Sequence, residues 1–283
     1  MAEPLLIDRC DGVLTVTLNR PRVKNAMPLA GWAALRDAFR SVDPLADRVV
    51  VVTGADGDFC AGADLDTGAP NTGAPNTGAP NTGAPNTGAS GTGTHPVDDM
   101  RIVGDACLAL HRLPVPTIAR VDGVAVGAGM NLALMCDFVV ASTRARFSEI
   151  FVQRAMSVDF GGSWILPRLV GLHRAKELVL LGDIIDAGTA REIGLVHRVA
   201  DEPELDAAVA ELAARLAAGP RLAMAGSKAL LNACFDRTLE QALDDEGRTQ
   251  AISLSSPDAD EAIEAFRQKR PPVYGGTRPQ EGS

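Results

Sequence analysis

The chain has 283 residues, of which 46% are hydrophobic and 22% charged, and its formal net charge is -9. This balance is typical of a soluble globular protein with a core for one large domain or two small ones, and it excludes disorder along the whole chain. Since the acidic charge is not offset by a local cluster of Lys and Arg, we expect no nucleic-acid partner.

We expect a cytoplasmic protein with no membrane partner. The N-terminal segment MAEPLLIDRCDG lacks the basic and apolar regions of a signal peptide. No apolar run approaches the ~20 residues of a membrane span. The five cysteines lie far apart and show no metal-ligand spacing, so we expect reduced core thiols, no disulfide and no metal site.

The first part of the chain alternates between strand and helix patterns. Residues 5–21 predict two strands joined at an Asp-Gly turn, because apolar residues alternate on both sides of it. Residues 25–40 predict a helix. The β-branched run at 48–54 predicts a buried strand, and residues 58–64 predict the loop that follows it.

A repetitive segment interrupts this pattern. Residues 67–86 are four copies of TGAPN, followed by TGASGTGTHP. The segment has too few apolar groups to offset the entropy of ordering it, so we expect a disordered surface insertion at 66–96. A period of five residues is too short for a solenoid.

Strand and helix patterns resume after the insertion and give way to helices alone. Residues 98–113 predict a helix. A strand pattern then turns at Asp122-Gly123 and reaches a helix start at 127–129. Further strands are expected at 137–142 and 145–149, and further helices at 162–169 and 174–181.

The fold class is therefore α/β, a layered spiral of ββα units over residues 1–200. Residues 201–283 predict an all-helical region, which begins with an apolar stripe on one helical face: Leu205, Ala208, Val209, Leu212 and Leu216. We expect this region to mediate oligomerisation.

Two loops have the composition that an oxyanion hole requires. CAGAD and VGAGMN place small residues at strand-to-helix junctions, where unpaired backbone N–H groups point outward at the positive end of a helix dipole. Each loop alone is more typical of tight helix packing. As a pair they are more informative, because two amides that meet one thioester oxygen would stabilise an enolate.

Five segments in this order resemble the crotonase superfamily, the enoyl-CoA hydratase/isomerase family: NRPRVKNAM, DFCAGADL, GVAVGAGMNLALMCDFVVAS, GGSWILPRLVG and AREIGLV. They span nearly the whole chain outside the repeat. The resemblance implies a crotonase-like spiral with a C-terminal trimerisation region, in homotrimers or dimers of trimers. It also implies an acyl-CoA substrate, with coenzyme A entering as part of that substrate and no separate cofactor.

Site residues follow from the resemblance. The amides of Ala63 and Ala128 occupy the oxyanion-hole positions. Alanine in place of the family's usual middle glycine is tolerable if φ of Ala128 is negative. The segments that hold CoA in the family correspond here to Lys24, Ala26, Ala61, Asp64 and Leu65. Lys24 could equally be a solvated loop charge.

The acid/base residues depart from the hydratase pattern. The two glutamate positions of family hydratases hold Asn131 and Phe151, which cannot exchange a proton near neutral pH. Asp159 stands where the family's double-bond isomerases carry a single carboxylate. The resemblance therefore favours isomerisation through Asp159.

Several alternatives remain open at this point. Asp159 could simply be an N-cap or a turn residue before the helix expected near Gly162. Glu149 is a reserve carboxylate, which strand alternation would point away from the site. The protein could also be a hydratase that uses Asp159 and one other group, or an acyl-CoA-binding protein without catalysis, since the usual glutamates are absent.

Overall fold

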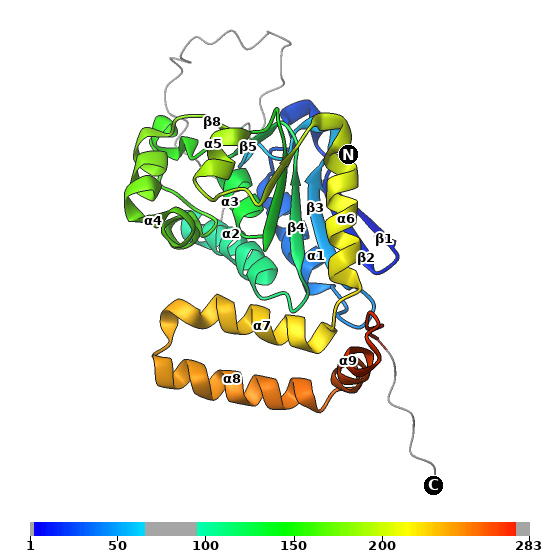
Figure 1. Ribbon diagram of the computed structural model, residues 1–283. Helices are drawn as coiled ribbons and strands as arrows, with labels where there is room; N and C mark the ends of the chain where they lie inside the picture. Colours follow the sequence, from blue (N-terminus) through cyan, green and yellow to red (C-terminus); the bar gives the residue numbers. More distant parts are fainter. Residues whose placement is uncertain (1–2, 66–94, 276–283) are drawn as a thin grey trace.

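The computed structural model describes residues 3–65 and 95–275. The insertion predicted at 66–96 lies outside the described residues except for His95 and Pro96, so its disorder stays a prediction. His95 caps the helix that Pro96 begins, by accepting a hydrogen bond from the N–H of Val97. Figure 1 shows an α/β body above a separate layer of helices.

The N-terminal hairpin is confirmed. Strands β1 (Leu5–Cys10) and β2 (Val13–Leu18) pair antiparallel. Asp11 and Gly12 both have positive φ, as the two-residue turn of a twisted hairpin requires. β2 buries every second residue, because one face of the strand lies on the core.

Two sheets form the body of the protein. The larger has the strand order β1-β2-β3-β4-β6-β9, and all its pairs except β1 with β2 are parallel. The smaller has the order β5-β7-β8. The remaining strands are β3 (Val49–Gly54), β4 (Thr117–Val121), β5 (Val124–Val126), β6 (Phe138–Ser142), β7 (Arg146–Ser148), β8 (Ile185–Asp186) and β9 (Arg198–Ala200). The predicted α/β spiral is confirmed.

The helices of the body are α1 (Leu29–Arg40), α2 (Pro96–His111), α3 (Ala128–Leu134), α4 (Gly162–Leu181) and α5 (Ala187–Glu192). The helix predicted from residue 25 begins only at Leu29, because Lys24 and Asn25 adopt left-handed φ values of 53° and 57°. The two helices predicted at 162–169 and 174–181 form one run, α4, interrupted at Gly171 by a non-helical φ of 75°.

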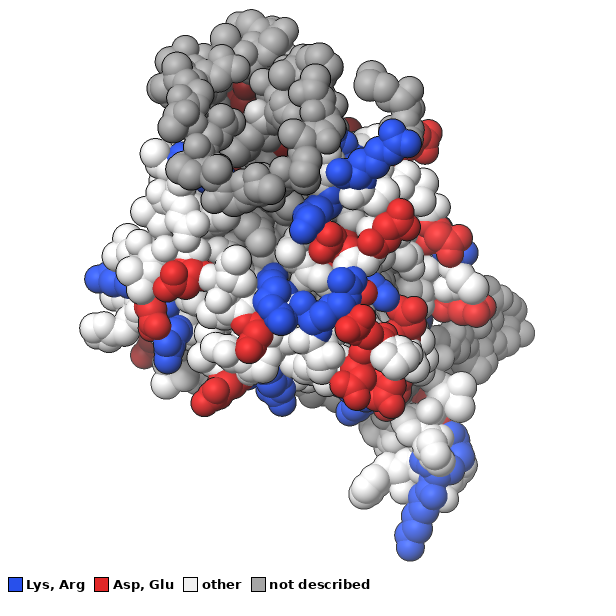
Figure 2. Space-filling model, turned by 90° about the horizontal axis from the view of Figure 1, so that it is seen from above, with Lys and Arg blue, Asp and Glu red and all other residues white. Residues whose placement is uncertain are grey.

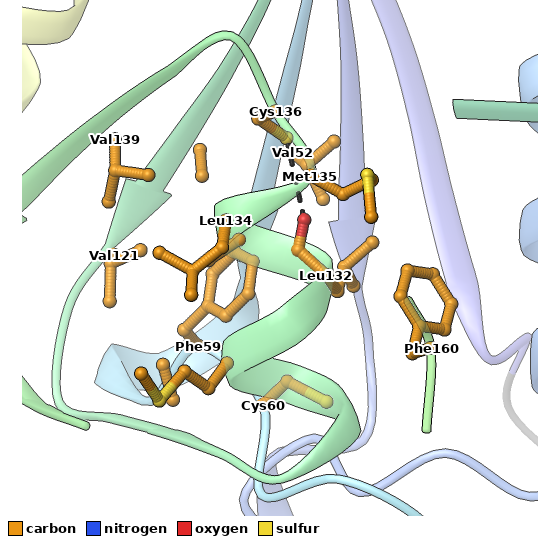
Figure 3. Packing of buried hydrophobic residues seen from close by; sticks show 14 of the residues in the cluster. Val52, Phe59, Cys60, Val121, Leu132, Leu134, Met135, Cys136, Val139 and Phe160 are labelled. Atoms are coloured by element: carbon orange, nitrogen blue, oxygen red, sulfur yellow. Dashed lines mark hydrogen bonds between the residues drawn. The ribbon is translucent and has the colours of Figure 1, made fainter. Parts of the chain in front are cut away.

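Helix α3 lies in the middle of the main core. All seven of its residues are buried. Figure 3 shows Leu132 and Leu134 of this helix among Phe59, Val121 and Val139, with Phe160 nearby. Because apolar side chains surround α3, its first turn has a fixed position, and this turn carries one of the predicted oxyanion loops.

Helix α6 (Leu205–Ala217) covers the opposite face of the large sheet. Its predicted apolar stripe is confirmed, since Leu205, Ala208 and Val209 are buried against strand residues that include Val51 and Ile118. This packing places α6 with the body. The predicted boundary between residues 200 and 201 stays a prediction.

Three further helices, predicted as a helical tail, lie below the body in Figure 1. They are α7 (Arg221–Ala233), α8 (Leu239–Leu254) and α9 (Pro257–Gln268). Large apolar side chains on this layer are exposed, namely Leu231, Phe235, Leu239, Leu243, Ile252 and Phe266. Trimerisation through this region stays a prediction.

Figure 2 shows Lys and Arg next to Asp and Glu across the visible face. Within residues 3–65 and 95–275, no helix combines the length and apolar character needed to cross a bilayer.

Cys60, Cys107 and Cys136 are buried thiols as predicted. The prediction is wrong for Cys10 and Cys234, which are exposed because they lie at the ends of edge strand β1 and helix α7.

Candidate active site

The two predicted oxyanion loops lie side by side. The N–H groups of Phe59 and Cys60 donate to Val124 O at 3.1 and 2.9 Å, and Val126 N–H donates to Cys60 O at 2.9 Å. The CAGAD loop after β3 therefore runs along β5, which leads into α3. A Cβ atom on Gly62 would lie 3.6 Å from the amide nitrogen of Ala128, so the two loops approach each other closely.

Glycines permit this approach. Gly62 has φ of +91°, and Gly127, the residue before α3, has φ of +56°. Residues other than glycine rarely adopt these backbone conformations. Ala128 is the first helical residue and does not have positive φ, so an alanine causes no strain at this position.

Both predicted oxyanion amides are free to bind a ligand. Within the described part of the chain, the N–H groups of Ala63 and Ala128 donate to no acceptor. The Ala128 N–H is one of the unpaired amides at the start of α3, at the positive end of the helix dipole. Ala63 is exposed. The arrangement suits an oxygen that gains negative charge during a reaction.

Asn131, one helical turn after Ala128, holds the polar side of the site together. Its side chain is completely buried. Nδ2 donates to Glu149 Oε2 at 3.3 Å and to the main-chain oxygen of Asp159 at 3.0 Å. The structure therefore brings Asp159 to the helix that begins with Ala128. Phe151 is also buried, with its ring 3.5 Å from where a Cβ of Gly127 would lie.

Asp159 is not a helix cap. The N-cap of α4 is Gly161, and no side chain caps this helix. Asp159 Oδ1 is buried without a hydrogen-bond partner within residues 3–65 and 95–275. Burial raises the pKa of Asp159 to about 6, because the charged carboxylate loses water. The carboxyl group can thus gain and lose a proton near neutral pH.

The prediction that Glu149 points away from the site is wrong. Strand alternation does not extend to it, because β7 ends at Ser148 and the chain turns into a short 3-10 helix, η3 (Ile150–Arg154). Glu149 is completely buried. Burial raises its pKa to about 8; hydrogen bonding by Asn131 opposes this shift, and the charge of Asp159 adds to it.

Asn25 is a residue that sequence reasoning missed. It is completely buried. Its Nδ2 donates to Ala55 O at 2.9 Å and to Asp58 O at 2.7 Å, and its Oδ1 accepts from Arg20 N–H at 2.8 Å. These bonds fix the loop that leads to Ala63. The residue type at this position could have indicated the role, because Asn tolerates left-handed φ and therefore favours a turn over a helix here.

Comparisons with known proteins identify the family. The sequence model of the enoyl-CoA hydratase/isomerase family matches residues 8–86 and 99–277. The chain belongs to this family. It is 35% identical over 282 residues to the 1,2-epoxyphenylacetyl-CoA isomerase of Escherichia coli (strain K12), covering 98% of this chain and 100% of the relative.

Solved structures share the crotonase fold. An enoyl-CoA hydratase from Mycobacterium smegmatis has a TM-score of 0.83 and 34% identity, with 96% of this chain and 99% of that one covered. A Thermobifida fusca YX protein solved in complex with CoA has a TM-score of 0.77 and 32% identity, with 92% and 95% covered. The predicted membership of the enoyl-CoA hydratase/isomerase family is confirmed, and the relatives include proteins named hydratase and proteins named isomerase.

The enoyl-CoA hydratase/isomerase segments expected to hold CoA lie together. Ala61 N–H donates to Lys24 O at 3.0 Å, and Asp64 N–H donates to Met27 O at 2.9 Å. Lys24 and Leu65 are exposed, whereas Ala26 is buried. The carboxylate of Asp64 forms an ion pair with Arg20 at 2.7 Å, so this side chain holds the loop. The CoA-binding roles of these residues stay predictions.

A cavity of about 740 Å³ opens between α2, α4 and α7. Cys107, Met135 and Trp164 are among its lining residues. The Cys107 thiol donates to Phe160 O at 3.5 Å. Burial, with the added charge of Asp159, raises the pKa of Cys107 to about 12. Cys107 therefore links this mostly apolar space to the segment that carries Asp159.

Proposed function

We propose that this member of the family isomerises the double bond of an enoyl-CoA, from the β,γ to the α,β position. The observation that carries the proposal is the carboxyl group of Asp159. It is half-buried, its Oδ1 has no hydrogen-bond partner among the described residues, and Asn131 holds its backbone to the helix that starts at Ala128.

The oxyanion loops would stabilise the intermediate. In the proposed reaction, the thioester oxygen accepts hydrogen bonds from the N–H groups of Ala63 and Ala128. Removal of a proton from C2 sends the C–H electron pair into the thioester, and the oxygen gains the negative charge. Each such donor contributes about 3 kcal/mol of barrier lowering in comparable sites.

Asp159 would move the proton. Its carboxylate takes the C2 proton and becomes a carboxylic acid, which then protonates C4 while the enolate collapses. The C3–C4 double bond becomes a C2–C3 double bond, and Asp159 returns to its starting state. A pKa of about 6 suits both halves of this exchange, because the base is ionised at neutral pH and its conjugate acid still gives up the proton readily.

The partner and substrate assignments follow from the same proposal. Coenzyme A enters as part of the substrate, held along Lys24, Ala26, Ala61, Asp64 and Leu65, and the acyl chain extends toward the cavity lined by Cys107 and Trp164. The CoA complex of the Thermobifida fusca YX relative supports the first assignment. We further propose a cytoplasmic homotrimer or dimer of trimers, with the exposed apolar side chains of α7 to α9 between copies.

The experiment follows double-bond migration in a 3-enoyl-CoA and deuterium incorporation at C2 and C4. We expect Asp159→Asn to reduce both by roughly 10²- to 10⁴-fold, the usual contribution of a general base. Asp183→Asn serves as the control, because Asp183 is an exposed acidic residue next to α4. Turnover by Asp159→Asn at the wild-type rate would contradict the proposal.

Hydration is a second candidate function, and Glu149 is the observation that favours it. A water-adding enzyme of this type needs a base for the water and an acid that protonates C2. Asp159 and Glu149 flank Asn131 and differ in pKa, about 6 against about 8. Loss of the enoyl absorbance of crotonyl-CoA, sustained over many turnovers, would favour hydration over isomerisation.

A further inference from the structure

A buried cluster next to the proposed base has more hydrogen-bond acceptors than donors. Both hydrogens of Asn131 Nδ2 are already donated, one to Glu149 Oε2 and one to the main-chain oxygen of Asp159. Three buried oxygens have no partner among the described residues: Asn131 Oδ1, Glu149 Oε1 and Asp159 Oδ1. Buried acceptors that lack a donor cost free energy, so the cluster needs a further proton.

Rotation of the amide cannot supply that proton. A Cβ atom on Gly162 would lie 2.4 Å from Asn131 Nδ2 and 2.7 Å from Oδ1, so the side chain is tightly confined. Turning it over would also point Oδ1 at two oxygen atoms. The proton therefore belongs on one of the two carboxyl groups.

Burial decides which carboxyl group carries it. Glu149 is completely buried, whereas Asp159 is half-buried. Removing a carboxylate from water disfavours its charge, and the penalty is larger for the group that is more deeply buried. The proton belongs on Glu149, and the charge on Asp159.

The pKa values of the two carboxyl groups agree with a protonated Glu149 and an ionised Asp159. The pKa is raised to about 8 for Glu149 and to about 6 for Asp159. Among the described residues, Asp159 in the segment between η3 and α4 is the charged group that acts on Glu149, and Asn131 of α3 is the neutral donor. Between these two pKa values the pair holds one proton and one negative charge.

We propose that Glu149 is a positioning residue that remains protonated while Asp159 is ionised. Its Oε1–H donates, directly or through one water, to Asp159 Oδ1 and holds the carboxylate in the orientation needed for proton transfer. This inference rests on the proposed function, since it assigns Glu149 a role in support of Asp159. Ionisation of Glu149 removes the donor and places a second negative charge beside the base.

The pH dependence of double-bond migration tests the role. We expect kcat/KM of the wild type to fall above an apparent pKa near 8. Glu149→Gln supplies an amide N–H that does not titrate, so this alkaline decline should disappear. Glu149→Leu supplies no donor, and we expect its kcat to fall by about tenfold or more with little change in KM. An alkaline decline unchanged in Glu149→Gln overturns the inference.

A spectroscopic measurement separates this inference from the proposed function. Difference infrared spectra near pH 7 should show the C=O stretch of a protonated carboxyl group in the wild type and in Asp159→Asn. The band should be missing in Glu149→Gln. Its absence from the wild type overturns the inference even if Asp159 is the proton shuttle. Wild-type turnover by Asp159→Asn would instead contradict the proposed function, with or without the infrared band.

Discussion

Gly129 of α3 packs directly on the backbone of Cys60, because a Cβ atom at Gly129 would lie 2.2 Å from the Cys60 carbonyl oxygen. The helix that carries Ala128 therefore approaches the CAGAD loop more closely than any side chain allows. We predict that Gly129→Ala separates the two oxyanion amides. Turnover of an enoyl-CoA should fall by roughly 10²-fold or more, comparable to the loss of one oxyanion donor.

The control for this prediction is Gly104→Ala in α2. A Cβ atom there would meet nothing within 4 Å beyond the neighbouring backbone of its own helix, and alanine favours a helix interior by about 1 kcal/mol over glycine. Thermal unfolding and turnover are measured for both variants. Wild-type turnover in Gly129→Ala would contradict the close-contact explanation.

Asn25→Ala should destabilise the protein and loosen the site. The substitution leaves the carbonyls of Ala55 and Asp58 and the Arg20 amide without their side-chain partner. Each buried polar group left unpaired costs about 1–3 kcal/mol. Urea unfolding should show a loss of this size or more. Asn19→Ala, which removes one surface hydrogen bond, should change stability far less.

Stability should depend on pH through Glu149. The folded protein holds this proton up to a pKa of about 8, whereas the unfolded chain releases it near pH ~4.3. The folded state thus binds more protons between these values, and stability falls as pH rises through this window. Since one pKa unit corresponds to about 1.4 kcal/mol, Glu149→Gln should gain a few kcal/mol relative to the wild type on going from pH ~5 to pH ~8. Equal pH dependence of urea unfolding in both proteins would refute this prediction.

Lys24 offers a test of CoA recognition. Its side chain is exposed beside the loop that leads to Ala61, where a cation can meet a phosphate of CoA. Lys24→Ala should raise KM for an acyl-CoA several-fold and leave kcat nearly unchanged. The effect should shrink for a substrate made from 3′-dephospho-CoA. The same rise in KM for both substrates would assign the effect to something other than the 3′-phosphate.

Much of the fold could be predicted from the sequence, because it depends on local patterns. The alternation around Asp11-Gly12 predicts the first hairpin, and the apolar stripe from Leu205 predicts α6. The start of α1 could not be predicted from apolar spacing, since the left-handed conformation at Asn25 depends on its bonds to the distant residues Ala55 and Asp58.

The residues alone predict the part of the candidate site that depends on backbone, whereas Asp159 follows from the family resemblance. Small residues around Ala63 and Ala128 indicate exposed amides, and the structure places their loops together. The surroundings of Glu149 are set by Asn131 from another element, 18 positions away in the sequence. Strand alternation carries no information on where the chain leaves the strand, so the orientation of Glu149 required the tertiary structure.

The double donation by Asn131 limits how this protein could evolve. The family resemblance places a glutamate at this position in hydratases, but a glutamate carboxylate here would face Glu149 Oε2 and the Asp159 carbonyl, both of which need a donor. We therefore expect Asn131→Glu alone to leave these two acceptors without their donor. The double donation thus couples the choice of residue at position 131 to the choice at position 149.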